Sequence, residues 1–217
     1  MGVVDPIHPR DLLRPRLRGW LHLVAAPISL VAGIVLVAVI PEHRLAAAIY
    51  SLSVTGLFTT SALYHRVTWT PRARAIMKRL DHSMIFVLIA GSYTGFAVAS
   101  LEPSTARLVL TVVWIGAVLG IGFRVLWPAA PRWVLTPAYV ALGWVAIFFM
   151  PDIIRGGGVA AAVLMMVGGA FYSLGAVAYA TRRPNPAPAT FGYHEVFHAC
   201  TLVGALCHYI GIWLAHY

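Results

Sequence analysis

The stretch WLHLVAAPISLVAGIVLVAVI, residues 20–40, decides the class of fold. It contains no Asp, Glu, Lys or Arg, and its polar side chains are one histidine and one serine. A helix needs about 20 predominantly apolar residues to cross the hydrocarbon core of a membrane. The stretch is therefore predicted to be a membrane-spanning helix.

Further apolar runs of similar length follow along the chain. They occupy residues 45–65, 82–101, 106–127, 133–150, 159–180 and 192–214. The gaps between them are short and contain proline or charged residues, so no soluble domain is predicted. We expect an all-α integral membrane protein: a single bundle of seven transmembrane helices over residues 20–217, preceded by a basic tail at 1–19, with no cleavable signal peptide.

The composition agrees with a membrane environment. Hydrophobic residues make up 60% of the 217 residues and charged residues only 11%, whereas a soluble domain has about 25% charged residues. Lys and Arg number 16 against 7 Asp and Glu, an excess that could also indicate nucleic-acid binding. We exclude nucleic acid as a partner, because cytoplasmic loops of membrane proteins collect basic residues. Membrane lipid is the expected surrounding and a possible substrate.

The basic residues fall mainly on one side of the predicted bundle. Thirteen belong to the N-terminal tail and to the loops after the second, fourth and sixth spans, whereas Arg44, Arg107 and Arg155 lie on the other side. Lys and Arg near span ends mark the cytoplasmic face. This predicts a cytoplasmic N-terminus, an outside C-terminus and a multi-pass protein of the cell membrane. The fifth run is the shortest, but the charge balance favours seven spans.

Ionisable side chains inside spans are costly and indicate function by default. Those remaining after the loops are removed are His22, His65, Asp81, His82, His194, Glu195, His198, His208 and His216. The second span ends, and the third and seventh spans begin, on the cytoplasmic side. The histidines and carboxylates of these three spans are therefore predicted to lie at one membrane depth.

Their spacing indicates a metal site. Ser61 and His65 are four residues apart, as are His194 and His198, so each pair shares a helical face. Three imidazoles with an open fourth position form the pattern of a catalytic zinc site, where the pKa of a bound water falls from about 15.7 to about 7. Asp81 could act as base or accept a hydrogen bond from that water, and Ser61 could donate to a developing oxyanion.

Simpler interpretations exist for several of these residues. A histidine near a membrane interface often extends toward the lipid headgroups or binds a backbone carbonyl. One of these two is our expectation for the four outside the predicted site: His22, His82, His208 and His216. Asp81 could pair with Arg79 or cap the third span. The segment His194-Glu195-Val-Phe-His198 also fits the H-E-x-x-H pattern of metalloproteases, in which the glutamate is the general base.

Three motifs resemble the bacterial hemolysin III family: Ser61-x-x-x-His65, Arg79-Leu-Asp81-His82 followed by Ile89-Ala-Gly-Ser-Tyr-Thr94, and His194-Glu195-x-x-His198. This family is related to the progestin and adipoQ receptors and, more distantly, to alkaline ceramidases. The resemblance implies seven spans with an inside N-terminus. It implies that His65, His194 and His198 bind zinc, that Asp81 holds the zinc-bound water, and that Ser61 assists.

Three functions follow as expectations. The first is a zinc-dependent intramembrane hydrolase of a lipid or amphipathic amide or ester, because the superfamily is thought to hydrolyse lipid amides or related bonds. The second is a receptor-like or pore-forming, cytolytic protein with structural zinc; hemolysin III takes its name from cell lysis. The third is an intramembrane metalloprotease that uses Glu195, although no second motif supplies an acidic ligand unless Asp81 serves.

Overall fold

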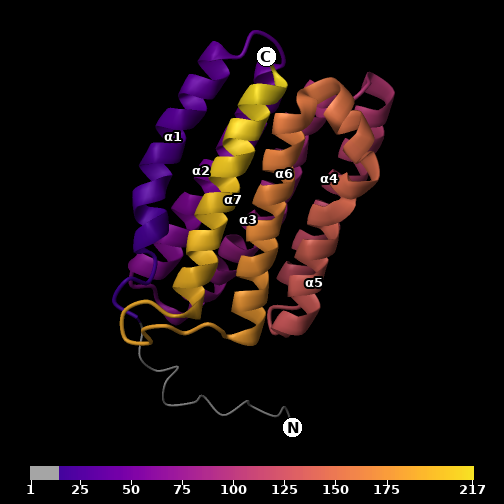
Figure 1. Ribbon diagram of the computed structural model, residues 1–217. Coiled ribbons are helices and arrows are strands. Elements are labelled where there is room, and N and C mark those ends of the chain that lie inside the picture. Colours follow the sequence, from indigo (N-terminus) through magenta and orange to yellow (C-terminus); the bar gives the residue numbers. More distant parts are fainter. Residues whose placement is uncertain (1–14) are drawn as a thin grey trace.

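A computed structural model describes residues 15–217, which form a bundle of helices without any β-strand in this range (Figure 1). The elements are α1 (Trp20–Val39), α2 (Arg44–Arg66), α3 (Pro71–Ser100), α4 (Pro103–Leu126), α5 (Arg132–Gly143), the 3₁₀-helix η2 (Trp144–Phe149), α6 (Met150–Thr181) and α7 (Tyr193–Ala215). The all-α prediction is confirmed. Arg10 and Arg14 of the predicted tail lie outside the described residues.

The outer surface of the bundle is apolar in the way that lipid requires. On α1, Ile28 and Val31 are each 62% exposed, and on α4, Val118 and Leu119 are exposed to a similar degree. Among residues 15–217, six helical segments are long and apolar enough to cross a membrane. A helix satisfies its own backbone hydrogen bonds, which is why lipid-facing segments take this form.

The segment from α5 to α6 counts as one of those six, a candidate span of 50 residues. A straight helix of that length would extend about 75 Å, more than twice the hydrocarbon core. Figure 1 shows instead that α5 and η2 run toward one end of the bundle and that α6 returns. Tyr93 contacts the junction of α5 and η2: its hydroxyl donates to Gly143 O (2.9 Å) and accepts from Ala146 N (2.5 Å). Gly158, with φ 83° and ψ 160°, is non-helical.

Helix α3 begins about three turns earlier than the sequence predicted. Thr70 caps it by accepting a hydrogen bond from Ala73 N (3.3 Å), and Pro71 occupies the first turn. Proline is favoured at this position because its ring already has helical φ. Asp81 therefore lies inside α3 and does not cap it, so that alternative is wrong. The basic residues assigned to a loop belong to the helix, because Lys and Arg are good helix formers.

Helix α7 lies between α1 and α6, near the middle of the bundle (Figure 1). The Tyr50 hydroxyl of α2 donates to Ala205 O of α7 (2.9 Å), and the Tyr209 hydroxyl donates to Ala32 O of α1 (3.1 Å). Glycines let α6 approach α7 closely: a Cβ on Gly168 would lie 3.0 Å from Gly204 O. Such contacts between small residues drive helix association in membranes. They place the histidines of α7 inside the protein.

Candidate metal centre

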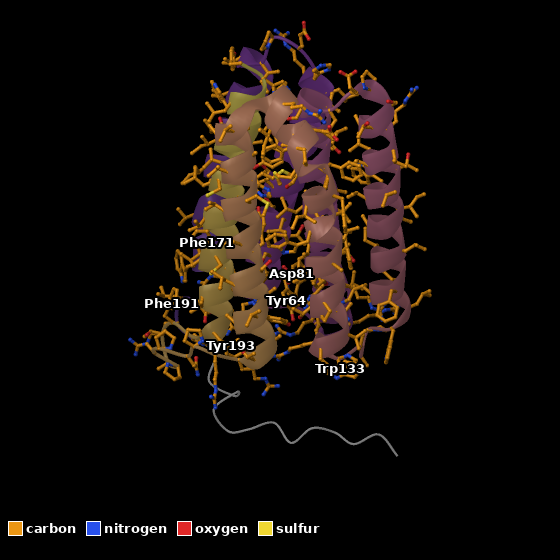
Figure 2. The ribbon with its side chains drawn as sticks, turned by 45° about the vertical axis from the view of Figure 1, so that its right-hand side comes forward. Tyr64, Asp81, Trp133, Phe171, Phe191 and Tyr193 are labelled. Carbon is orange, nitrogen blue, oxygen red and sulfur yellow. The ribbon has the colours of Figure 1, made fainter. Side chains whose placement is uncertain are left out.

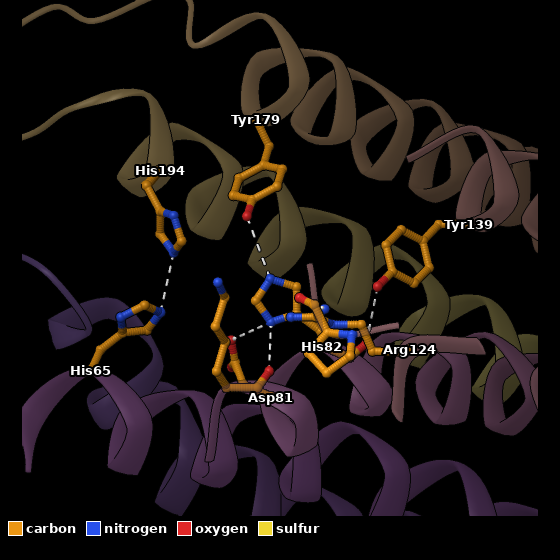
Figure 3. Close-up of polar contacts among 9 residues, drawn as sticks. His65, Asp81, His82, Arg124, Tyr139, Tyr179 and His194 are labelled. Atoms are coloured by element: carbon orange, nitrogen blue, oxygen red, sulfur yellow. Dashed lines mark hydrogen bonds and ion pairs between the residues drawn. The ribbon is translucent and has the colours of Figure 1, made fainter. Parts of the chain in front are cut away.

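The structure brings together the three histidines that the sequence predicted as metal ligands. His65 lies at the end of α2, and His194 and His198 occupy the first two turns of α7. One ring nitrogen from each lies within 4.8 Å of the other two, and Nε2 of His65 is 3.1 Å from Nε2 of His194 (Figure 3). His65 is 6% exposed and His198 is 2% exposed. The predicted juxtaposition of these histidines is confirmed.

The donor set fits a metal ion. In a tetrahedral zinc site with Zn–N bonds of about 2.0–2.1 Å, two nitrogens lie about 3.3 Å apart. The 3.1 Å between His65 and His194 is close to this value, and a ring nitrogen of His198 lies within 4.8 Å of both. Imidazole suits zinc, copper, iron and nickel. These three residues could therefore hold one metal ion.

Asp81 and Ser61 lie beside this cluster. Asp81 extends from the third turn of α3, and Ser61 of α2 lies close enough to interact with its carboxylate. Both residues line the same cavity as His194 and His198. Figure 2 shows Asp81 in the lower half of the bundle, above Tyr193 at the lower end. A carboxylate is thus available next to a potential metal site.

His82 is held in place by backbone and tyrosine contacts. Its Nδ1 donates to Lys78 O (2.7 Å), and the Tyr179 hydroxyl lies 3.4 Å from its Nε2 (Figure 3). The same ring lies 3.6 Å from the Asp81 carboxylate, and the Tyr139 hydroxyl donates to the His82 carbonyl (3.2 Å). The prediction of a backbone-bonded histidine is confirmed here. The sequence analysis did not identify the two tyrosines, since they come from α5 and α6.

Two of the other histidines also bind backbone carbonyls, as predicted. His208 donates to Met165 O (3.1 Å), and His216 donates to Ile212 O (2.8 Å). His22 differs, because it is 1% exposed and its ring is stacked on His198. The position of His22 in the sequence is consistent with this contact. His22 lies at the cytoplasmic start of the first predicted span, on the same side of the membrane as the three predicted metal ligands.

Glu195 is engaged in structure. Its carboxylate forms an ion pair with Arg18 and accepts a hydrogen bond from Gly192 N (2.9 Å), the residue that precedes the first turn of α7. Glu195 is fully buried. Both carboxylate oxygens therefore have partners, and neither is free to act on a water molecule at the histidines. The ion pair also joins the segment before α1 to α7.

A cavity adjoins the site and extends through the bundle. Its volume is about 140 Å³, and its walls come mainly from α3, α5, α6 and α7. Its polar end is lined by Ser61, Asp81 and His194, and it reaches as far as His208. His194 and His208 are separated by roughly 21 Å along α7, at about 1.5 Å per residue. Long, mostly apolar cavities with a few polar groups are typical ligand sites.

Comparison with known proteins agrees with this architecture. The sequence model of the family described as "Haemolysin-III related" matches residues 10–209. The hemolysin-3 homolog of Bacillus subtilis (strain 168) is 30% identical over 159 residues, covering 72% of this chain and 70% of the relative. Hemolysin-3 of Bacillus cereus is 31% identical over 164 residues, covering 72% and 73% respectively. The chain therefore belongs to the haemolysin-III-related family of multi-pass integral membrane proteins.

Proposed function

We propose that this protein is a zinc-dependent intramembrane hydrolase that acts on an amide or ester of a lipid or another amphipathic molecule. One observation carries the proposal: three imidazole donors converge, and two of them, His194 and His198, line an apolar cavity together with the carboxylate of Asp81. Three protein ligands with an open position are typical of catalytic zinc, whereas structural zinc sites have four protein ligands. No fourth His, Cys, Asp or Glu joins the group within residues 15–217.

The residues have distinct roles in this reaction. Zinc held by His65, His194 and His198 would supply Lewis acidity and acidify a bound water. Asp81 orients the attacking water and accepts its proton, because its carboxylate faces the same cavity. Ser61, which lies beside Asp81, can direct its hydroxyl to the oxygen of the carbonyl under attack.

The shape of the cavity supports an amphipathic substrate. The scissile bond would lie at the polar end, beside Asp81 and His194, and the hydrocarbon portion would extend toward His208. Leu57, Ile85 and other apolar side chains form most of the wall. Burial of a chain against such walls is worth about 0.8 kcal/mol for each CH₂ group. A lipid substrate would therefore be held mainly by its chain.

The contacts of Glu195 disfavour a metalloprotease. That mechanism needs a free glutamate as general base, whereas the Glu195 carboxylate has Arg18 and Gly192 as partners. A receptor-like or pore-forming protein with structural zinc is the remaining alternative. The three-ligand histidine group favours the enzyme over this alternative, and a hydrolysis assay tests the choice between them.

The hydrolysis assay uses purified protein in lipid nanodiscs and a panel of N-acyl amides and acyl esters. We expect turnover that disappears after the metal is stripped and returns with Zn²⁺ but not with Mg²⁺, which prefers oxygen ligands. Equal turnover by metal-free protein would contradict the zinc mechanism. Zinc-loaded protein that hydrolyses no member of the panel would favour the receptor-like or pore-forming function.

We also propose seven passes, with the N-terminus in the cytoplasm. The α5–η2 segment and α6 then count as two passes, which agrees with their opposite directions in Figure 1. Reporters fused after Ala187, in the loop between α6 and α7, are expected to be in the cytoplasm because Arg182 and Arg183 flank that loop. Reporters fused after Tyr217 are expected outside. A cytoplasmic signal after Tyr217 would contradict the orientation or the number of passes.

A further inference from the structure

The first residues of the described chain lie directly against the helices that carry the histidine cluster. Arg18 pairs with Glu195 of α7. Gly19 has φ 81°, and a Cβ at this position would lie only 2.6 Å from Cβ of His65. Glycine meets both demands, because it adopts positive φ without cost and has no side chain. The start of α1 is therefore in direct contact with both α2 and α7 at the metal centre.

His22 extends from this start of α1 into the centre itself. Its ring lies parallel to that of His198, with centroids 3.8 Å apart and an interplanar angle of 12°. Phe58 contacts the His22 ring at 4.9 Å. His22 is 1% exposed and lines the cavity. Within residues 15–217 its two ring nitrogens have no hydrogen-bond partner, and the backbone of His198 lies close to the ring.

The orientation of His198 needs an explanation. A metal-binding histidine is usually oriented by a hydrogen bond from its second ring nitrogen to a carboxylate, a carbonyl or water. Nδ1 of His198 is buried and has no hydrogen-bond partner in the described part of the chain. The parallel ring of His22 covers one face of His198 instead. This stack restricts how the His198 ring can turn.

We infer that His22 is a positioning residue of the metal centre, which holds the His198 ring in its ligating orientation by stacking on it. This inference rests on the proposed zinc site. His22 does not itself belong to the three-ligand group. The centre is then built from α1, α2 and α7, and the Arg18–Glu195 pair keeps α1 in position for the stack. An aromatic ring of similar size at position 22 should serve the same purpose.

The test compares His22→Ala and His22→Phe with wild-type protein. Affinity for Zn²⁺ is measured by competition with a chromophoric chelator, and the geometry of the site by the visible absorption of bound Co²⁺. We expect His22→Ala to weaken zinc binding by about 10–100-fold, as loss of other orienting partners does, and to change the Co²⁺ spectrum. We expect His22→Phe to restore most of the affinity, because it can still stack.

His208→Ala is the matched control. His208 is also a buried histidine, but it donates to Met165 O (3.1 Å) at the far end of the cavity. The His208→Ala variant should have lower thermal stability but the same affinity for zinc as wild-type protein.

A His22→Ala variant with wild-type zinc affinity and a wild-type Co²⁺ spectrum would contradict the inference, because His22 would then serve only to fill space in the core. If His22→Phe and His22→Ala lose zinc affinity equally, and the wild-type Co²⁺ spectrum indicates a fourth nitrogen ligand, then His22 is itself a ligand. That result would also overturn the inference. Wild-type protein that binds no metal would refute the zinc site itself.

Discussion

Replacement of Asp81 by Asn is expected to keep the zinc and to lower hydrolysis by about 10²–10⁴-fold, the usual contribution of a general base. The three histidine ligands are untouched by this change, and Asn has nearly the same shape as Asp. The amide cannot accept the proton of the attacking water. Zinc content and the rate on the best substrate of the lipid panel are the two measurements. Loss of zinc together with activity would show that Asp81 is a ligand instead.

Glu195→Gln is the matched control for this prediction. Its carboxylate pairs with Arg18 and accepts from Gly192 N, away from the reaction in our account. The Gln amide oxygen can still accept from Arg18, so the start of α1 and the His22 stack should stay in place, and the variant should keep zinc and most of the hydrolysis. It should lose about 1–3 kcal/mol of stability, because the buried contact loses one of its two charges. The reverse ranking, with Glu195→Gln inactive and Asp81→Asn active, would support the metalloprotease.

Simultaneous replacement of His65, His194 and His198 by Ala is expected to abolish metal binding and hydrolysis. No other group of three His, Cys, Asp or Glu side chains in residues 15–217 converges to hold an ion. Metal content and thermal stability are measured together. A triple variant that is folded and binds zinc at the wild-type ratio would show that the metal lies elsewhere.

The sequence predicted the features of this protein that depend on local pattern. Apolar runs near the membrane thickness indicated the spans, because lipid permits few other structures. The four-residue spacing of His194 and His198 placed both on one face of α7. His65 could be assigned to the same site because successive spans alternate in direction. The end of the second span and the start of the seventh therefore lie on the same side of the membrane. The structure confirms that the three are neighbours.

Features that depend on contacts between distant segments were harder to predict. His22 resembled an ordinary interfacial histidine, and only the packing of α1 shows its stack on His198. Glu195 matched a protease motif, but its partner Arg18 is 177 residues away in the chain. The break after α5 depends on Tyr93 of α3, whose hydroxyl satisfies the freed backbone groups. None of these pairs leaves a periodic signal in the sequence.

Zinc analysis of the wild-type protein tests the central claim most directly. The protein is purified in detergent without chelators, and zinc and protein are determined in the same sample by elemental analysis and amino-acid analysis. The convergence of His65, His194 and His198 predicts about one zinc for each chain. Protein that is folded, contains no metal and takes up none from a zinc-buffered solution would contradict the account.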